Sequence, residues 1–303
     1  MLIVQNIRLS RIIRNTWQVD IIMIISCTAA YLLRTFLFRH HFEVPAIIPT
    51  VLGTAIAFFV GFNNNQSYDR WWEARKIWGG LVNDSRSWAR SVTCYISQND
   101  MSDADFEALK DRMVHRHIAF LYALKAKLRG ATDETYHLYL EKAEDTETNT
   151  HSNVPNAILN YQSRELEELS RKGMIDGFRF MEMNQLIVKF CDGMGMSERI
   201  KNTVFPTTYN YFTKIFIWLF VVSLTLVISQ YAGLASIFLG WLVGFVYVST
   251  QINGMSLIDP FENNSTAIPL NQITRSIEIN LLEMIGATDI PDPVKPINDE
   301  YVL

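Results

Sequence analysis

This chain has few cysteines, a small net charge and no recognisable catalytic signature. Its 3 cysteines, Cys27, Cys94 and Cys191, lie far apart and show neither metal-site spacing nor a disulfide framework. A net charge of -4 leaves no strongly basic face, which argues against binding to nucleic acid. Signatures of serine hydrolases, phosphate loops, zinc proteases and dinucleotide-binding folds are missing as well. These absences predict a reduced or membrane setting and a protein that is not an enzyme.

Long apolar runs, by contrast, gather toward the two ends of the chain. Four runs have about the length that a membrane-crossing helix needs: residues 20–38, 44–62, 212–229 and 234–250. A short link at residues 230–233 predicts that the last two form a helical hairpin through the membrane. Residues 1–19 alternate apolar residues with arginines, which predicts an amphipathic helix at the membrane face.

The middle of the chain is charged and predicts a helical domain. Apolar residues recur there at three- and four-residue steps, as on helix faces. Asn63–Gln66 predicts a turn at the end of the second apolar run, and residues 133–156 predict a loop or a poorly ordered excursion. A last amphipathic helix is predicted over residues 270–286. The predicted parts are an amphipathic helix with two crossings (1–62), a helical cytoplasmic domain (63–211), two further crossings (212–250) and a cytoplasmic C-terminal segment (251–303).

The distribution of basic residues predicts the orientation in the membrane. Four crossings put both termini and the 63–211 domain on one side, together with Arg70, Arg75 and Lys76. The links at residues 39–43 and 230–233, on the other side, carry little charge. Because basic residues favour the cytoplasmic side, we expect a multi-pass protein of the cell membrane with both termini in the cytoplasm.

The second crossing has an unusual helix face. Thr54, Phe58 and Phe62 share one side at four-residue steps, and Gly53 and Gly61 would allow neighbouring helices to approach closely. No internal repeat is visible, so a central pathway would need several copies of the chain. Rings of phenylalanine around an axis gate by dewetting and tolerate an anion at their edges. Periodicity alone leaves open the alternative that these side chains pack in the subunit or contact lipid.

Three motifs carry a resemblance to a known family. They are GFNNNQSYDRWWEARKIWG at residues 61–79, FPTTY at residues 205–209, and IDPF at residues 258–261. The chain resembles the bacterial branch of the bestrophin family over most of its length. The resemblance implies an all-α membrane protein with four transmembrane helices per subunit and a large helical cytoplasmic domain. It further implies a homopentamer around a central pore.

The same resemblance implies two constrictions. The family's hydrophobic neck falls at Thr54, Phe58 and Phe62, where Thr54 departs from a neck that is usually apolar at all three levels. That departure implies either a wetter upper neck or a register shifted by one turn. By offset from the Glu-Met-Asn motif at residues 182–184, a cytoplasmic aperture falls near Met174 or Ile175.

The resemblance also bears on cofactors. Animal bestrophins carry a calcium clasp with an acidic run just after their Asn/Asp-Pro-Phe motif. Here the corresponding residues, Glu262 to Thr266, contain one carboxylate. Because tight calcium sites need several hard oxygen ligands, we expect no calcium activation through this segment and no cofactor.

The resulting hypothesis is a pentameric channel for small monovalent ions, with anions such as chloride favoured by the phenylalanine levels of the neck. Its partners would be further copies of itself, small inorganic ions and the lipid bilayer. A cation-selective channel of the same architecture is the alternative, because an acidic domain would attract cations. Two other classes stay open: a non-conducting scaffold that docks partners through its cytoplasmic domain, and a membrane enzyme with a metal at His40 and His41.

Overall fold

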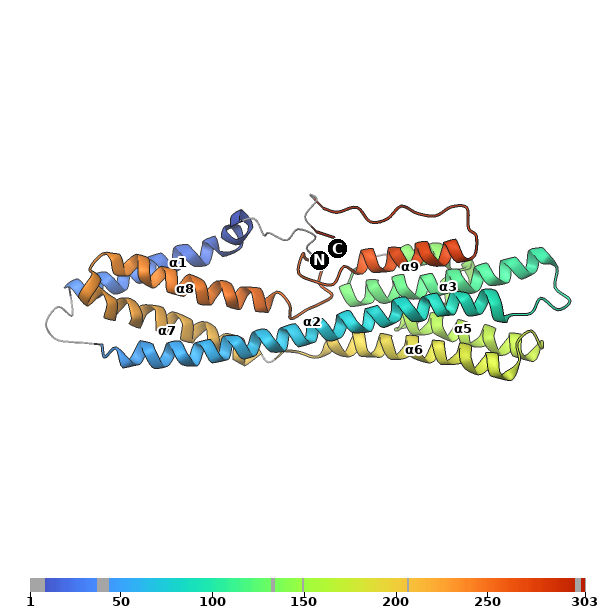
Figure 1. The fold of residues 1–303 in the computed structure, drawn as a ribbon, viewed down its shortest axis with the longest axis horizontal. Helices are drawn as coiled ribbons and strands as arrows, with labels where there is room; N and C mark the ends of the chain where they lie inside the picture. Colours follow the sequence, from blue (N-terminus) through green and yellow to red (C-terminus); the bar gives the residue numbers. More distant parts are fainter. Residues whose placement is uncertain are drawn as a thin grey trace. The chain divides into compact units, whose positions relative to one another are not determined.

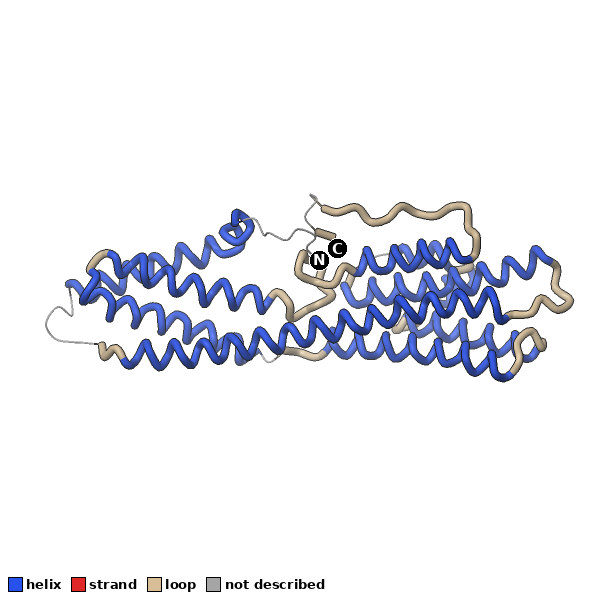
Figure 2. The backbone as a smooth tube through the Cα atoms, in the orientation of Figure 1, coloured by secondary structure: helices blue, strands red, loops and turns tan. Residues whose placement is uncertain are grey.

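The fold is helical. The computed structural model describes residues 9–36, 44–131, 134–148, 150–205, 207–297 and 301–302. Within these ranges, one isolated bridge joins Ile297 to Tyr301 and no strand occurs (Figure 2). The helices are α1 (Leu9–Phe36), α2 (Ile47–Tyr95), α3 (Asp103–Arg129), the 3-10 helix η1 (Glu134–Tyr139), α4 (Lys142–Thr148), α5 (Val154–Arg171), α6 (Gly177–Asn202), α7 (Thr207–Ala232), α8 (Ala235–Met255) and α9 (Leu270–Met284). The prediction of an all-helical chain is confirmed.

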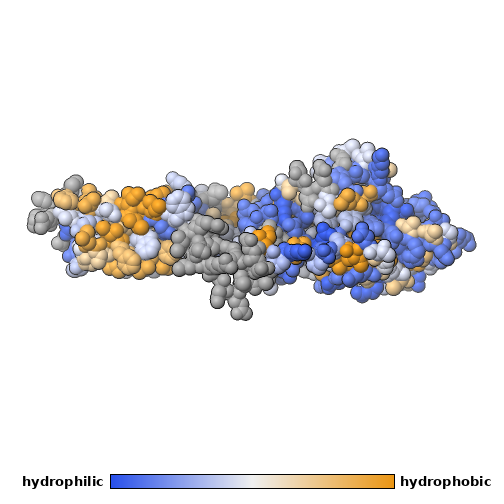
Figure 3. Space-filling model, turned by 90° about the horizontal axis from the view of Figure 1, so that it is seen from above, coloured by the Kyte–Doolittle hydropathy of each residue, from blue (hydrophilic) through white to orange (hydrophobic). Residues whose placement is uncertain are grey.

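The chain divides into two compact units. The apolar unit holds α1, α2 up to Trp71, α7 and α8; the polar unit holds α2 from Trp72, α3 to α6, and α9. On the face drawn in Figure 3, the apolar unit is mostly hydrophobic and the polar unit mostly hydrophilic. Among the described helices, four are long and apolar enough to cross a membrane, and they are α1, α2, α7 and α8. These are the four runs in which crossings were predicted.

Side chains of α1 and α7 pack directly against a glycine of α8 in the apolar unit. A Cβ on Gly244 would lie 2.4 Å from Sδ of Met23 on α1 and 2.7 Å from Cγ2 of Val221 on α7. Small residues allow this approach in membrane bundles, where packing between helices replaces much of the hydrophobic effect. Gly233, with a φ of 55°, makes the turn between α7 and α8. The predicted hairpin is therefore confirmed (Figure 1).

The turn predicted at Asn63–Gln66 is wrong, because α2 continues through it without a break (Figure 1). The asparagine side chains hydrogen-bond to neighbouring helices instead of capping a helix end. Asn63 Nδ2 donates to Thr213 Oγ1 (3.5 Å), and Asn64 Nδ2 donates to the Thr250 carbonyl (3.2 Å). The predicted boundary after residue 62 consequently falls inside a helix. The amphipathic helix predicted for residues 1–19 is, from Leu9 onward, the start of α1; residues 1–8 lie outside the described ranges.

Capping residues and an aromatic core define the polar unit. Ser102 caps the N-terminus of α3 and Asp176 that of α6, each accepting from backbone N–H groups of the first turn. His117 is fully buried in the core with its ring centroid 4.3 Å from that of Phe190, and its Nε2 lies 2.8 Å from Ser85 Oγ. Burial lowers the pKa of His117 to about 3. This histidine is thus a neutral packing residue.

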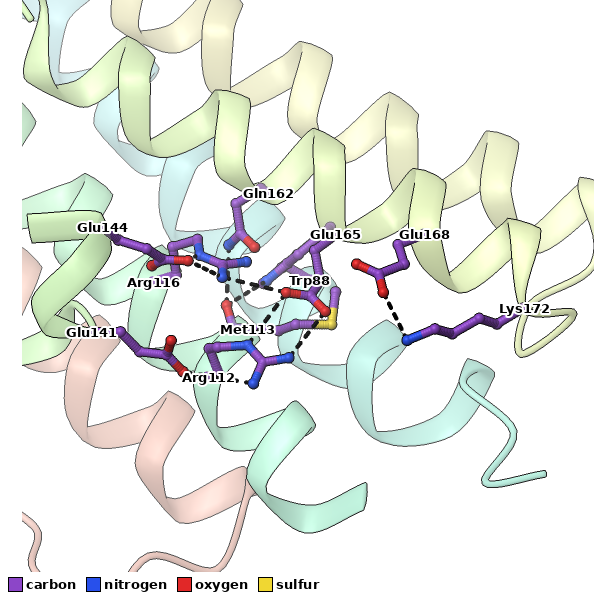
Figure 4. A network of polar contacts seen from close by, with 10 residues as sticks. All are labelled: Trp88, Arg112, Met113, Arg116, Glu141, Glu144, Gln162, Glu165, Glu168 and Lys172. Carbon is purple, nitrogen blue, oxygen red and sulfur yellow. Dashed lines mark hydrogen bonds and ion pairs between the residues drawn. The ribbon is translucent and has the colours of Figure 1, made fainter. Parts of the chain in front are cut away.

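Ion pairs order the segment for which a loop was predicted. In place of disorder over residues 133–156, the described residues form η1, α4 and the start of α5. Arg112 and Arg116 of α3 pair with Glu165 of α5, at 3.0 and 3.3 Å, and also with Glu141 and Glu144 of this segment (Figure 4). The prediction failed because charged side chains, and not apolar ones, attach this segment to the domain. Its sequence therefore shows no hydrophobic periodicity from which helices could be predicted.

A second anchor of this segment is a buried carboxylate. Glu278 of α9 accepts hydrogen bonds from the hydroxyls of Tyr122 on α3 and Tyr139 on η1, and pairs with Arg275. Burial and the neighbouring carboxylate raise the pKa of Tyr122 and Tyr139, so both stay neutral donors. The segment is therefore fixed both to α3 and to α9.

We expect the Arg116→Met variant to lose a large part of the stability of the chain. The Arg116 side chain is 3% exposed, and its removal leaves Glu144 and Glu165 without their buried guanidinium. Removing one partner of a buried ion pair costs about 3–5 kcal/mol of unfolding free energy. Thermal unfolding of the purified full chain in detergent measures the change. Arg171→Met is the matched control, since the Arg171–Glu167 pair is exposed and such pairs contribute about 0–1 kcal/mol. Equal shifts in both variants would contradict a structural role for the network.

Acidification should destabilise the chain through His117. Its pKa is about 3 in the folded chain, below the ordinary 6.5, so the unfolded chain takes up the proton first. The stability that neutral His117 contributes is complete above pH 6.5 and is lost as the pH falls toward 3. At pH 5 the loss is about 2 kcal/mol, measurable as the difference in denaturant unfolding between pH 7.5 and 5. His117→Gln should flatten this dependence, whereas the exposed control His151→Gln should retain it; an unchanged slope in His117→Gln would refute the assignment.

Candidate functional site

Three residues of α2 share an exposed face in the apolar unit. Thr54, Phe58 and Phe62 follow one another at four-residue steps, which aligns them along one side of the helix. Phe58 is 71% exposed and Phe62 46% exposed, and Thr54 is also exposed. The opposite side of the helix carries Ile56 and Val60, which are buried in the core of the unit. The residues predicted as a pore neck therefore lie together, away from the subunit core.

The hydroxyl of Thr54 is engaged within its own helix. Thr54 Oγ1 donates to the carbonyl of Thr50 at 3.0 Å, and one turn earlier Thr50 Oγ1 donates to the carbonyl of Ala46 at 2.8 Å. A threonine bonded in this way has no free hydrogen-bond donor for water or an ion; it offers its methyl group and an oxygen lone pair. Thr54 consequently departs less from an apolar level than its residue type implies.

The rings of Phe58 and Phe62 are held in position by different contacts. Phe58 makes an edge contact with its neighbour Phe59, with ring centroids 6.0 Å apart. Phe62 contacts Tyr209 of α7, with centroids 6.5 Å apart. The Phe62 ring therefore depends on a second helix for its position, whereas the Phe58 ring is positioned by α2 itself.

Two contacts hold the back of α2 behind this face. The Tyr247 hydroxyl of α8 donates to the carbonyl of Gly53 at 3.2 Å. A Cβ on Gly53 would lie 3.0 Å from the ring of Phe220 on α7, so the close approach predicted at Gly53 is found. At Gly61, a Cβ would meet nothing within 4 Å in the described chain, and no close approach is found there. The face with Thr54 and Phe58 is thus backed by both α7 and α8.

Met174 and Ile175, where an aperture was predicted, are each 3% exposed and lie within the polar unit. The Met174 carbonyl accepts from the Ser97 backbone N–H at 2.8 Å, which fixes this turn to the end of α2. The next helix, α6, begins just after Asp176 and presents Phe178 with 92% of its surface exposed. The helix-start signal at Asp176 is the feature of the sequence that could have drawn attention to Phe178.

The segment after α8 uses its oxygens within the chain. Asp259 Oδ2 pairs with the ammonium group of Lys201 at 2.6 Å, and its Oδ1 accepts from the Phe261 backbone N–H. Glu262 accepts from the amide of Asn264. Across the described residues, no group of three or more His, Cys, Asp or Glu side chains is placed to hold a metal ion. His40 and His41 lie outside the described ranges.

Comparisons with known proteins agree on one family. Residues 2–283 match the model of Bestrophin_2, described as "Bacterial/Fungal Bestrophin protein". The chain is 30% identical over 248 residues to the Escherichia coli K12 protein named "Voltage-dependent anion channel-forming protein YneE", covering 82% of this chain and 79% of that one. A similarly named protein of Ralstonia nicotianae is 25% identical over 246 residues, or 80% and 78% of the two chains.

Solved structures show the same fold. A bacterial bestrophin homolog from Klebsiella pneumoniae superposes with a TM-score of 0.81 at 24% identity. The match covers 89% of this chain and 98% of that one. At this identity, the likeness establishes the arrangement of the helices.

Gly254→Ala should weaken the attachment of α2 to α8. A Cβ at this position would lie 1.7 Å from Asn64 Oδ1, so the Asn64 side chain would have to leave the Thr250 carbonyl. We expect a loss of about 0.5–1.5 kcal/mol, because the hydrogen bond between α2 and α8 is broken. Gly195→Ala is the control: nothing lies within 4 Å of its Cβ, and Gly to Ala inside a helix stabilises by about 0.5–1 kcal/mol. Thermal unfolding of both variants compares them, and a Gly254→Ala protein as stable as the wild type would contradict this packing.

Proposed function

Because the chain belongs to the bestrophin family, by its match to the bacterial and fungal family model and to curated relatives, we propose that it is an ion channel. The observation that carries this proposal is the exposed face of α2 with Thr54, Phe58 and Phe62. Aromatic side chains exposed on a membrane-crossing helix contact lipid, a further copy of the chain or a pathway, and membership of the bestrophin family favours the last two. Five copies of the chain around an axis would turn these three residues into stacked rings.

The proposed neck favours small monovalent anions such as chloride. The edges of phenylalanine rings carry partial positive charge, and rings at the Phe58 and Phe62 levels would present such edges to a permeating ion. A narrow apolar constriction also controls conduction by wetting and dewetting. The names of the relatives, which describe anion channel-forming proteins, support this choice over cations.

A second constriction is proposed at the turn before α6. Met174 and Ile175 are buried in the subunit, so a side chain that reaches a pathway from this turn has to come from its exposed part. Phe178 is the exposed side chain that follows, and we assign the aperture level to it, with Met174 and Ile175 supporting the turn from within the subunit.

The assembly is a homopentamer in the cell membrane, with both termini and the polar unit in the cytoplasm. The positive-inside tendency of Arg70, Arg75 and Lys76 supports this orientation. Calcium has no role in the proposal, because Asp259 is paired with Lys201 and the following segment contributes one more carboxylate, that of Glu262.

Recordings from the purified chain in planar bilayers test the proposal. We expect conductance, with a reversal potential under a KCl gradient on the chloride side of zero. Phe58→Ala should raise the conductance several-fold and weaken ion selection, because the neck becomes wider and more hydrated.

Phe238→Ala is the matched control, since Phe238 is an exposed phenylalanine on α8 and lies outside the proposed neck. Absence of wild-type conductance would refute the channel, and light scattering that finds a monomer or dimer would favour a scaffold instead. A Phe58→Ala protein that conducts like the wild type would refute the neck assignment alone. A reversal potential on the potassium side would favour the cation-selective alternative.

A further inference from the structure

The exposed face of α2 continues beyond the neck as a polar stripe. After Phe62, the residues at three- and four-residue steps on this side are Asn65 and Asp69, and both are exposed. From Val44 to Tyr68 the chain contains no Asp, Glu, Lys or Arg. Asp69 is thus the first charged residue of α2 after the three neck residues, and it lies on the same face of the helix.

Asp69 has no ion-pair partner among the residues that the structure describes. None of the hydrogen bonds or ion pairs found among the described residues involves its carboxylate, although many exposed acidic residues of this chain do have such a partner. The adjacent cation, Arg70, projects about 100° away around the helix and is partly buried. An exposed carboxylate that no neighbouring cation neutralises acts through its field on the ions that pass it.

We propose that Asp69 determines how strongly the channel discriminates between anions and cations. This inference rests on the proposed function, since it needs copies of α2 around one axis. In that arrangement Asp69 forms a ring of carboxylates at the inner end of the neck, the kind of element that attracts cations and repels anions. The ring opposes the anion preference of the Phe58 and Phe62 levels and limits the selectivity that they produce.

The distance along α2 makes this effect large enough to measure. Asp69 follows Phe62 by seven residues, about 10 Å along the helix axis. That is comparable to the Debye length of ~8 Å at physiological ionic strength. Five unit charges at this range, in water and screened by salt, raise the local concentration of cations and lower that of anions about two- to threefold each.

Reversal potentials of the Asp69→Asn channel under a KCl gradient test the proposal. We expect the chloride-to-potassium permeability ratio to rise about sixfold, since the ring acts in opposite directions on the two ions, while Asp69→Glu keeps the wild-type ratio. Glu283→Gln is the matched control, because Glu283 is also exposed but lies on α9 and belongs to neither proposed constriction. Light scattering checks that each variant assembles like the wild type.

A second measurement needs no variant. The wild-type permeability ratio should increase when the mean KCl concentration is raised to 1 M, where the Debye length falls to about 3 Å and the carboxylates are screened. If Asp69→Asn has the wild-type ratio, or if the wild-type ratio is independent of salt, the proposal is wrong even though the channel conducts. Absence of wild-type conductance would instead refute the proposed function, and this inference with it.

Discussion

The attachment of α2 along one side determines what the apolar unit can do. Asn63 and Asn64 bond to α7 and α8, the Gly53 carbonyl accepts from Tyr247, and Gly254 leaves room for the Asn64 side chain. In hydrocarbon, polar groups gain by finding such partners, because no water competes for them. These four contacts lie on the side of α2 that faces its own subunit. The aromatic and acidic residues of the stripe are exposed on the other side.

The polar unit is held together by a different balance of forces. Its core of Trp88, His117 and Phe190 is apolar and aromatic, but the segment around η1 and α4 is attached by the guanidinium groups of Arg112 and Arg116. Buried ion pairs contribute little net stability compared with apolar packing, yet they tolerate few alternative arrangements. The segment is consequently fixed in one place, even though its sequence is rich in residues typical of loops.

Hydrophobic periodicity predicted the structure correctly wherever a single physical effect determined it. The four crossings and the stripe of Thr54, Phe58 and Phe62 follow from apolar length and helical spacing, and the described helices agree with both. Prediction failed where a side chain had two physical options. Asn63 and Asn64 are as suited to cap a helix end as to bond between helices, and only the partners on α7 and α8 decide between these. Likewise, Glu141 and Glu144 resemble solvated residues until Arg112 and Arg116 are brought beside them. Burial of Met174 and Ile175 could not be foreseen either, because it depends on the turn that Ser97 fixes.

Thr54 gives one level of the proposed neck a side chain with both an apolar and a polar group. Rotation about a single side-chain bond exchanges the methyl group and the hydroxyl group on the exposed face, and such rotations take picoseconds to nanoseconds for exposed residues. The backbone of α2 and its attachments to α7 and α8 stay unchanged by this rotation. Threonine at position 54 can therefore present its methyl group to an apolar neighbour or its hydroxyl group to water. A valine or isoleucine of similar shape has no hydroxyl group to present.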